Sequence, residues 1–277
     1  MVEIRAVKVS INGGISVLSA FSNWIGGSAS IELPMEIVMS RSDSPPENRI
    51  VNDTVSYLAG RLKMDRNYSV EVKSKIPVSA GLKSSSALTL GVLLGMISLN
   101  EYQADNLEIL KLADLASISN GTSLTGAFDD LCSCFFGGYC ITDNRKMEIL
   151  KKGELPDRSV IIAYPIDNHR ITSGISMEKF SRYSGCFDQI SRQALDGNIF
   201  QAMDMNGFIM GSILGIDLRA IGSLLNLGCV HASQSGKGPA LFGIFDEDIP
   251  ERIDMPSGYG LIRTRFSNRK ASVVEVT

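Results

Sequence analysis

The segment from Ala87 to Leu99 constrains the fold most strongly, because it is apolar on nearly every face of a helix. Such a helix has to be covered on all sides, so the chain needs further layers of structure around it. The segment is too short to cross a bilayer, which takes about 20 apolar residues. The chain has 277 residues, of which 44% are hydrophobic, so it is long enough to bury a helix in its core.

Strands are expected both before and after this helix in the sequence. Residues 69–76 alternate between apolar and polar side chains, which predicts a half-buried strand that ends at Pro77. A second helix is expected from Asp105 to Asn120–Gly121, and a strand is expected after Gly137–Gly138. Beyond these, strands are predicted at 159–164, 240–245, 260–266 and 271–276, with a mostly helical section between about 173 and 227. This irregular order predicts an α+β fold.

The stretch Lys151 to Arg158 is the most linker-like part of the chain, since it is charged and contains Gly and Pro. Domain boundaries fall in such stretches. We therefore expect two domains, residues 1–153 and residues 154–277.

Composition excludes several classes of function. The chain carries 27 Lys and Arg against 30 Asp and Glu, a net charge of -3, which is atypical of nucleic-acid binders. His169 and His231 are its two histidines, too few for a multi-histidine metal site. No secretory signal or membrane span is apparent, so we expect a cytoplasmic protein that binds neither nucleic acid nor membrane. We expect the five cysteines to be buried as small hydrophobic residues. They are Cys132, Cys134, Cys140, Cys186 and Cys229.

A loop of small residues leads from the strand that ends at Pro77 into the buried helix. The first turn of a helix has free N–H groups, and small side chains let a phosphate approach them. Serine hydroxyls add donors and can complete the shell of a Mg²⁺ ion. The alternative is that the serines form an ordinary helix cap. Neither of the common phosphate-binding motifs, G-x-x-x-x-G-K-[ST] and G-x-G-x-x-G, occurs in the chain. The candidate phosphate-binding residues are Pro77, Val78, Ser79, Ala80, Gly81, Leu82, Lys83, Ser84, Ser85, Ser86 and Ala87.

Two further segments are candidates for the site. Thr125-Gly-Ala-Phe-Asp-Asp130 places two carboxylates after a glycine turn, where one of them can deprotonate a substrate hydroxyl and the other serve structure. Ser233-Gln-Ser-Gly-Lys-Gly-Pro-Ala240 contains a G-x-G turn that allows a close backbone approach. Each is also compatible with a plain structural turn.

Together the three segments resemble the GHMP small-molecule kinases. Pro77…Gly81-Leu-Lys-Ser-Ser-Ser-Ala87 matches the P-x-x-x-G-L-x-S-S-x-A motif of that family, and Ser235-Gly-Lys-Gly-Pro239 matches its S-G-x-G-P motif. With TGAFDD and FGG-x-x-x-TDN, the chain is most similar to the archaeal-type shikimate kinases. The resemblance covers essentially the whole chain. It implies an N-terminal half like domain 2 of ribosomal protein S5 and a ferredoxin-like C-terminal half.

The resemblance also implies an activity and roles for residues. It implies phosphorylation of a shikimate hydroxyl by ATP with Mg²⁺, giving shikimate 3-phosphate for aromatic amino acid and chorismate biosynthesis. The 77–87 loop would then bind the ATP phosphates and Ser85 would ligate Mg²⁺. Asp129 matches the catalytic aspartate, and Asp130 stands where mevalonate-type members have Asn. The C-terminal glycine motif contributes Ser235, Gly236 and Gly238.

Two positions depart from the pattern of the mevalonate-type members. Their second Mg²⁺ ligand, a glutamate, is replaced by Ile118, and Asp114 one turn earlier is a weak substitute. The N-terminal motif, from Val9 through Gly13–Gly14 to Gly26–Gly27, is atypical, although we expect it to border the site. Lys8 is a further candidate cation near the phosphates.

The substrate carboxylate needs an Arg or Lys partner, and we expect Arg170 to supply it. Alternatives stay open. One is a GHMP kinase for homoserine or mevalonate, a second is an inactive metabolite sensor of the same fold, and a third is a plain α+β interaction module. The oligomeric state is unknown.

Overall fold

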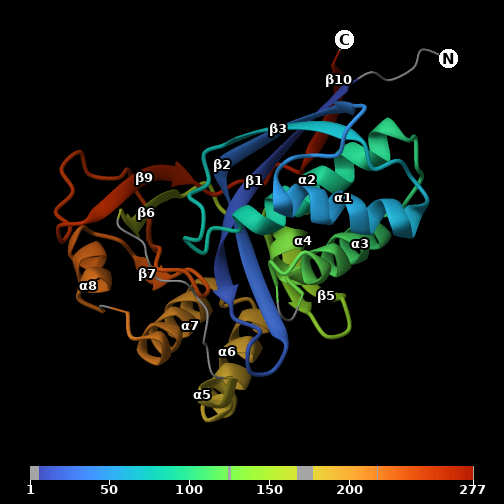
Figure 1. The fold of residues 1–277 in the computed structure, drawn as a ribbon. Coiled ribbons are helices and arrows are strands. Elements are labelled where there is room, and N and C mark those ends of the chain that lie inside the picture. The colour runs from blue at the N-terminus through green and yellow to red at the C-terminus, as the bar shows by residue number, and fades with distance from the viewer. Residues whose placement is uncertain (1–5, 124–125, 167–176, 217, 277) are drawn as a thin grey trace.

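The computed structural model describes residues 6–123, 126–166, 177–216 and 218–276. Two antiparallel sheets and two groups of helices make up this part of the chain (Figure 1). The α+β class predicted from the order of the elements is therefore confirmed.

The larger sheet runs in the order β10-β1-β2-β4-β5. Its strand β2 is long enough to pair with two strands along the same edge, because residues 35–41 pair with β3 and residues 25–29 pair with β4. The strands are β1 (Ala6–Leu18), β2 (Ile25–Arg41), β3 (Tyr68–Ser74), β4 (Tyr139–Asp143), β5 (Glu148–Gly153) and β10 (Ser272–Val276).

Three helices, α1, α3 and α4, pack around α2, which is the buried helix that the sequence predicts (Figure 1). Its glycines allow a close approach to the sheet, since a Cβ at Gly91 would collide with the side chain of Ile37 on β2. The ends of α3 also agree with the prediction, because Asp105 caps its start and Asn120 follows its last residue. The helices are α1 (Arg49–Leu62), α2 (Ser84–Leu99), α3 (Asn106–Ser119) and α4 (Phe128–Phe136).

The smaller sheet has the order β7-β8-β6-β9 and carries the second group of helices. Its strands are β6 (Ser159–Pro165), β7 (His231–Gln234), β8 (Leu241–Phe245) and β9 (Tyr259–Arg265). The helices are α5 (Met177–Ser181), α6 (Ser184–Asp196), α7 (Ile199–Leu214) and α8 (Leu218–Asn226).

The expected domain boundary, between residues 153 and 154, falls between β5 of the larger sheet and β6 of the smaller one. Two features connect the halves. β10 returns to the larger sheet and pairs with β1, so the two ends of the described chain lie close together in Figure 1. One hydrophobic core also contains residues of both halves, such as Ile31, Met203 and Phe242. The division into two domains stays a prediction.

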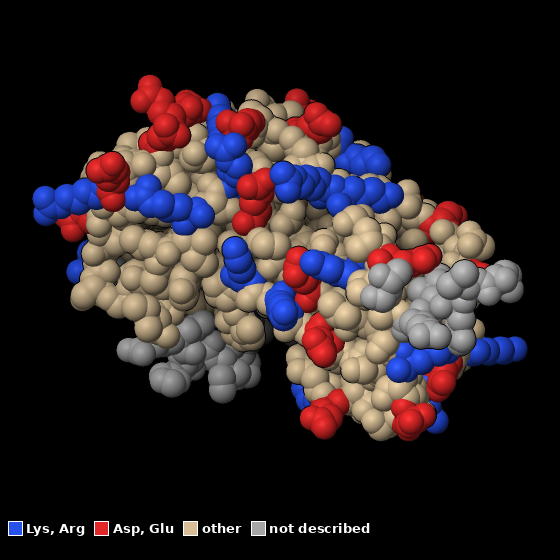
Figure 2. All heavy atoms as spheres, turned by 90° about the horizontal axis from the view of Figure 1, so that it is seen from above, with Lys and Arg blue, Asp and Glu red and all other residues tan. Residues whose placement is uncertain are grey.

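Burial departs from the prediction in two places. Val72 on β3 is 41% exposed although the alternation placed it on a buried face, because a pattern shows which side chains share a face and not whether that face is covered. Cys186 is exposed, whereas the other four cysteines are buried as expected, and all five are unpaired thiols. No helix within the described ranges is both long and apolar enough to span a membrane. On the face in Figure 2, acidic and basic residues lie interspersed.

Asn120 joins three helices through buried hydrogen bonds. Its Nδ2 donates to Thr54 Oγ1 on α1 at 2.9 Å and to Thr89 Oγ1 on α2 at 3.2 Å, while its Oδ1 accepts from Thr122 N. Asn120→Ala removes these partners and should lower the free energy of unfolding by roughly 1–3 kcal/mol. Urea titration measures this loss. Asn106→Ala, on an exposed position of α3, is the control and should change it by less than about 0.5 kcal/mol. Equal effects of the two variants would contradict this role of Asn120.

Candidate active site

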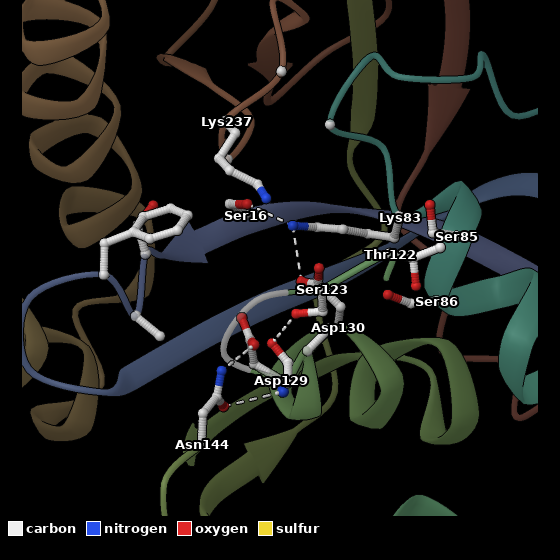
Figure 3. Close-up of a pocket in the computed structure, with 18 of the residues that line it drawn as sticks. Ser16, Lys83, Ser85, Ser86, Thr122, Ser123, Asp129, Asp130, Asn144 and Lys237 are labelled. Atoms are coloured by element: carbon white, nitrogen blue, oxygen red, sulfur yellow. Dashed lines mark hydrogen bonds and ion pairs between the residues drawn. The ribbon is translucent and has the colours of Figure 1, made fainter. Parts of the chain in front are cut away.

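A cavity of about 330 Å³ lies where five segments of the chain meet (Figure 3). The segments are the end of β1 with the loop after it, the loop before α2, the segment before α4, the end of β4, and the turn before β8. The residues that line it are Ser16, Leu18, Ser19, Ala20, Phe21, Ser79, Gly81, Lys83, Ser84, Ser85, Ser86, Thr122, Ser123, Gly126, Ala127, Asp129, Asp130, Asn144, Gly236, Lys237 and Gly238.

The loop before α2 has the backbone of an anion-binding site. Ser79, Gly81 and Lys83 all have positive φ, at 59°, 85° and 68°. Left-handed residues in such a turn leave successive N–H groups on one concave side. Lys83 stands at the cap position of α2, and no side chain in the described part of the chain caps this helix. The serines after it are therefore not an ordinary helix cap, and the first N–H groups of α2 are left for a ligand.

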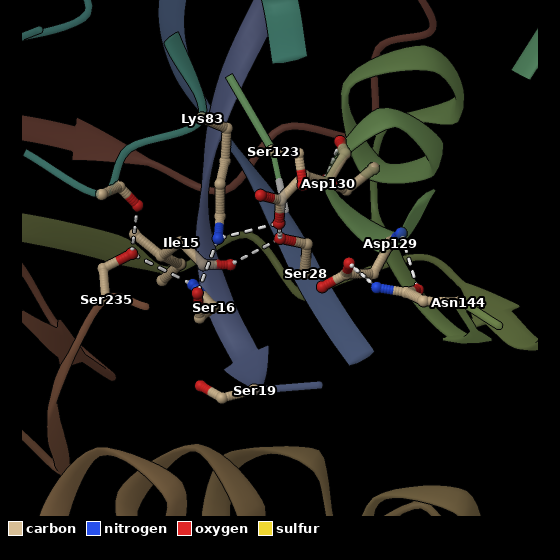
Figure 4. Close-up of polar contacts among 12 residues, drawn as sticks. Ile15, Ser16, Ser19, Ser28, Lys83, Ser123, Asp129, Asp130, Asn144 and Ser235 are labelled. Carbon is tan, nitrogen blue, oxygen red and sulfur yellow. Dashed lines mark hydrogen bonds and ion pairs between the residues drawn. The ribbon is translucent and has the colours of Figure 1, made fainter. Parts of the chain in front are cut away.

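The turn before β8 packs directly on this loop. Ser235 Oγ donates to the carbonyl of Gly81 at 2.7 Å and accepts from the N–H of Ser16 at 3.2 Å (Figure 4). The fit leaves no room for side chains, because a Cβ at Gly81 would collide with the Ser235 carbonyl and one at Gly238 with the Ala80 carbonyl. Ser235 thus holds three chain segments together beneath the cavity.

Lys83 reaches back from the helix start into the cavity. Its ammonium donates to Ser16 Oγ at 2.6 Å and lies 2.8 Å from Asp130 Oδ1. The same carboxylate oxygen accepts from Ser28 Oγ on β2 at 2.8 Å (Figure 4). The Lys83 side chain is 6% exposed, so this ion pair is largely shielded from water.

Asp129 has a different environment from its neighbour. Its Oδ1 accepts from Asn144 Nδ2 at 2.8 Å, and the N–H of Asp129 donates to Asn144 Oδ1 at 3.3 Å. Burial raises the pKa of Asp129 to about 7, with the Asp130 charge adding to the effect and Lys83 opposing it. The two adjacent carboxylates therefore differ, since one is paired with a lysine and the other is held by an amide and has a raised pKa.

Asp114 and Ile118 do not contribute to the cavity. Asp114 is buried below the 126–127 turn, where its Oδ1 accepts from the N–H of Ala127 at 2.8 Å. Its Oδ2 has no hydrogen-bond partner among the described residues, and burial raises the pKa of the carboxyl to about 6. Ile118 is 44% exposed. The carboxylate considered as a substitute metal ligand instead supports the backbone that leads to Asp129.

The structure brings most of the expected site residues together. Both aspartates, both glycines of the C-terminal motif and the residues Ser79, Gly81 and Lys83 to Ser86 line the cavity, and the N-terminal motif borders it through Ser16 and Ser19. Ala80, Leu82, Ala87 and Ser235 are buried behind it, and Val78 is 80% exposed. Pro77 stands outside the lining.

Lys8 pairs with Glu36 at 2.7 Å and does not line the cavity, so the expected role near the phosphates is wrong for it. Arg170 and Thr125 lie outside the described residues.

Sequence reasoning missed Phe21, Thr122, Ser123 and Asn144 as lining residues and gave Lys237 no role. The TDN end of β4 was the one available signal for Asn144.

Comparisons with known proteins identify relatives of this chain. Residues 49–138 match the family described as GHMP kinases N terminal domain. A shikimate kinase of Thermoplasma acidophilum is 38% identical over 268 residues, covering 96% of this chain and 97% of that protein.

Solved structures share the fold at low identity. The mevalonate kinase of Methanococcus jannaschii gives a TM-score of 0.73 at 13% identity, over 94% of this chain and 98% of that one. A homoserine kinase from Cytophaga hutchinsonii gives 0.70 at 14% identity, over 98% of each.

The raised pKa of Asp114 generates a prediction about stability. The carboxyl ionises near pH 6 in the folded chain instead of at its ordinary value of 3.8, so the folded state binds more protons between these values. The free energy of unfolding should therefore fall as the pH rises from about 4 to about 7, by up to roughly 3 kcal/mol from this group. Asp114→Asn keeps an acceptor for the Ala127 N–H and carries no charge, so it should lose this part of the slope.

Urea unfolding of both proteins at several pH values measures the difference. Asp196→Asn, at an exposed position on α6, is the control and should keep the wild-type slope. Parallel curves for Asp114→Asn and the wild type would show that Asp114 does not titrate in this range.

Proposed function

Because the chain belongs to the GHMP kinase family, alongside the shikimate kinases of archaea, we propose that it transfers the γ-phosphoryl group of ATP to a hydroxyl of shikimate. The observation that carries this proposal is one cavity that joins an anion-binding helix start to a lysine and two carboxylates. Phosphoryl transfer needs such positioning and charge neutralisation more than it needs covalent chemistry. The products are shikimate 3-phosphate and ADP.

The loop before α2 binds the triphosphate. The free N–H groups of the first turn of α2 and the hydroxyls of Ser84, Ser85 and Ser86 face the phosphate oxygens. Lys83 adds a positive charge next to them and is held in place by Ser16 and Asp130. Since these donors are fixed before the ligand arrives, little reorganisation is needed during the reaction.

The cavity also suits Mg²⁺. Its lining is rich in hydroxyl and carboxylate oxygens, the donors that this ion prefers. Ser85 would hold the ion together with phosphate oxygens and water, and neither Ile118 nor Asp114 is placed to help. When bound, Mg²⁺ neutralises charge on the phosphates.

Asp129 is the base in this proposal. Its carboxylate is oriented by Asn144, and a pKa of about 7 lets it accept a hydroxyl proton near neutral pH. Asp130 keeps Lys83 in place and, by its charge, raises the pKa of Asp129 further. Of the two adjacent carboxylates, Asp129 thus serves as the base and Asp130 holds Lys83 in place. We further propose that the enzyme works in the cytoplasm.

Release of ADP with candidate acceptors tests the proposed function. Purified protein is supplied with ATP and Mg²⁺ and then with shikimate, homoserine or mevalonate in parallel. Shikimate should give turnover at least about tenfold above the other two in kcat/KM. Faster turnover with homoserine or mevalonate would assign the chain to another GHMP kinase activity. Nucleotide binding without turnover on any acceptor would point to an inactive sensor.

Asp129→Asn tests the assignment of the base. It should lower kcat by roughly 10²–10⁴-fold with little change in nucleotide affinity, because the amide cannot accept a proton. In the wild type, kcat/KM should rise with pH through about 7, where Asp129 loses its proton, and this rise should be absent in the variant. Asp130→Asn is the comparison, since it removes the partner of Lys83 and should lower the melting temperature as well as activity. A kcat for Asp129→Asn within about threefold of wild type would exclude it as the base.

A further inference from the structure

Lys237 is the lysine in the cavity that the reaction described above does not use. It follows Gly236 in the turn before β8 and reaches into the cavity beside Ser16 and Lys83 (Figure 3). No carboxylate within the described residues lies at ion-pair distance from its ammonium, whereas Lys83 is held by Asp130. Burial lowers the pKa of Lys237, and the Lys83 charge adds to this while Asp130 opposes it.

The surroundings of Lys237 differ from those of the phosphate loop. Its Nζ lies 5.7 Å from the centre of the Phe21 ring, which belongs to the loop after β1. That ring is packed at 5.0 Å against Phe180 of α5, a fully buried side chain. Leu18 and Ala20 line the cavity from the same stretch. The Lys237 ammonium therefore lies next to a wall of apolar side chains, and Phe180 of the C-terminal half packs against this wall.

One of the two lysines that line the cavity lacks a carboxylate partner among the described residues. Lys83 and Lys237 are its two lysines in the described lining, and the one carboxylate within ion-pair distance of either is that of Asp130, on Lys83. A partly buried ammonium without a counter-ion is costly, and a ligand that brings a negative charge removes that cost. The phosphates already have the start of α2, three serines and Lys83. The unmatched charge is thus available to the second substrate.

We propose that Lys237 binds the carboxylate of the acceptor and that Phe21 forms the wall against which the ring of the acceptor packs. This inference rests on the proposed function, since it assumes a ring acid as the acceptor. It gives Lys237 the role that the sequence had suggested for Arg170. Lys237 is thereby a specificity residue, because it selects acids over neutral alcohols of the same shape.

Steady-state kinetics of Lys237→Met test the proposal. Loss of a charged hydrogen bond should raise the KM for shikimate by roughly 10- to 100-fold, with the KM for ATP changed by less than about twofold. Lys237→Arg keeps the charge and should recover most of the affinity. The control Lys152→Met removes an exposed lysine that lies over Phe136 outside the cavity, and it should behave like the wild type.

The methyl ester of shikimate tests the contact itself. The wild type should bind the ester far more weakly than the acid, whereas Lys237→Met should treat the two nearly alike, because the charge partner is already gone. Melting temperatures of all variants confirm that they are folded.

Other outcomes overturn the inference. A raised KM for ATP with an unchanged KM for shikimate would assign Lys237 to the nucleotide phosphates. An unchanged KM for both, or an ester penalty that persists in Lys237→Met, would show that Lys237 does not bind the carboxylate. A wild type without activity on shikimate refutes the proposed function and this inference with it, whereas an active wild type and an unaffected Lys237→Met refute the inference alone.

Discussion

The buried contact between Lys83 and Asp130 is the interaction on which the site depends. It links the start of α2 to α4, and the hydrogen bonds from Lys83 to Ser16 and from Ser28 to Asp130 extend it to β1 and β2. A buried ion pair contributes little net stability, because both charges lose their hydration. Removing one partner is nevertheless expensive, since the other charge is then left alone. The pair therefore acts mainly by fixing where the anion-binding turn stands relative to the two carboxylates.

Hydrogen bonds also fix the C-terminal half against the loop before α2. Ser235 contacts both Gly81 and Ser16, and the N–H of Ala240 donates to the Ala80 carbonyl at 3.1 Å. Two of these contacts are made by the Ser235 hydroxyl and one joins backbone to backbone, so the position of the C-terminal half relative to the phosphate loop is fixed next to the cavity. A kinase that must bring two substrates together benefits from this rigidity, because small misplacements are costly in rate.

Sequence reasoning predicted α2, α3, several of the strands and the three segments of the site, because each has a local sequence pattern, but it did not predict β1, β2 or α1. The all-round apolarity of 87–99 predicted α2, and the small residues of 77–87 predicted the anion-binding loop. It did not reach the contacts among segments, such as the one between Ser16 and Ser235, which are 219 residues apart. The capping position of Lys83 was also missed, since serine is the residue that local preference favours there. Phe21 and Lys237 lie next to each other only because the loop after β1 and the turn before β8 meet in the folded chain.

The pairing of β10 with β1 has a consequence for how the chain folds. Residues 6–10 form ladder pairs with residues 272–276, so this edge of β1 lacks its partner strand until residues 272–276 have been synthesised. An uncovered strand edge is a template for pairing with other chains. Contacts at such large sequence separation also slow folding, because the loop entropy is lost before the contact forms. The larger sheet therefore cannot be completed before residues 272–276 emerge, and until then the nascent chain exposes an aggregation-prone edge.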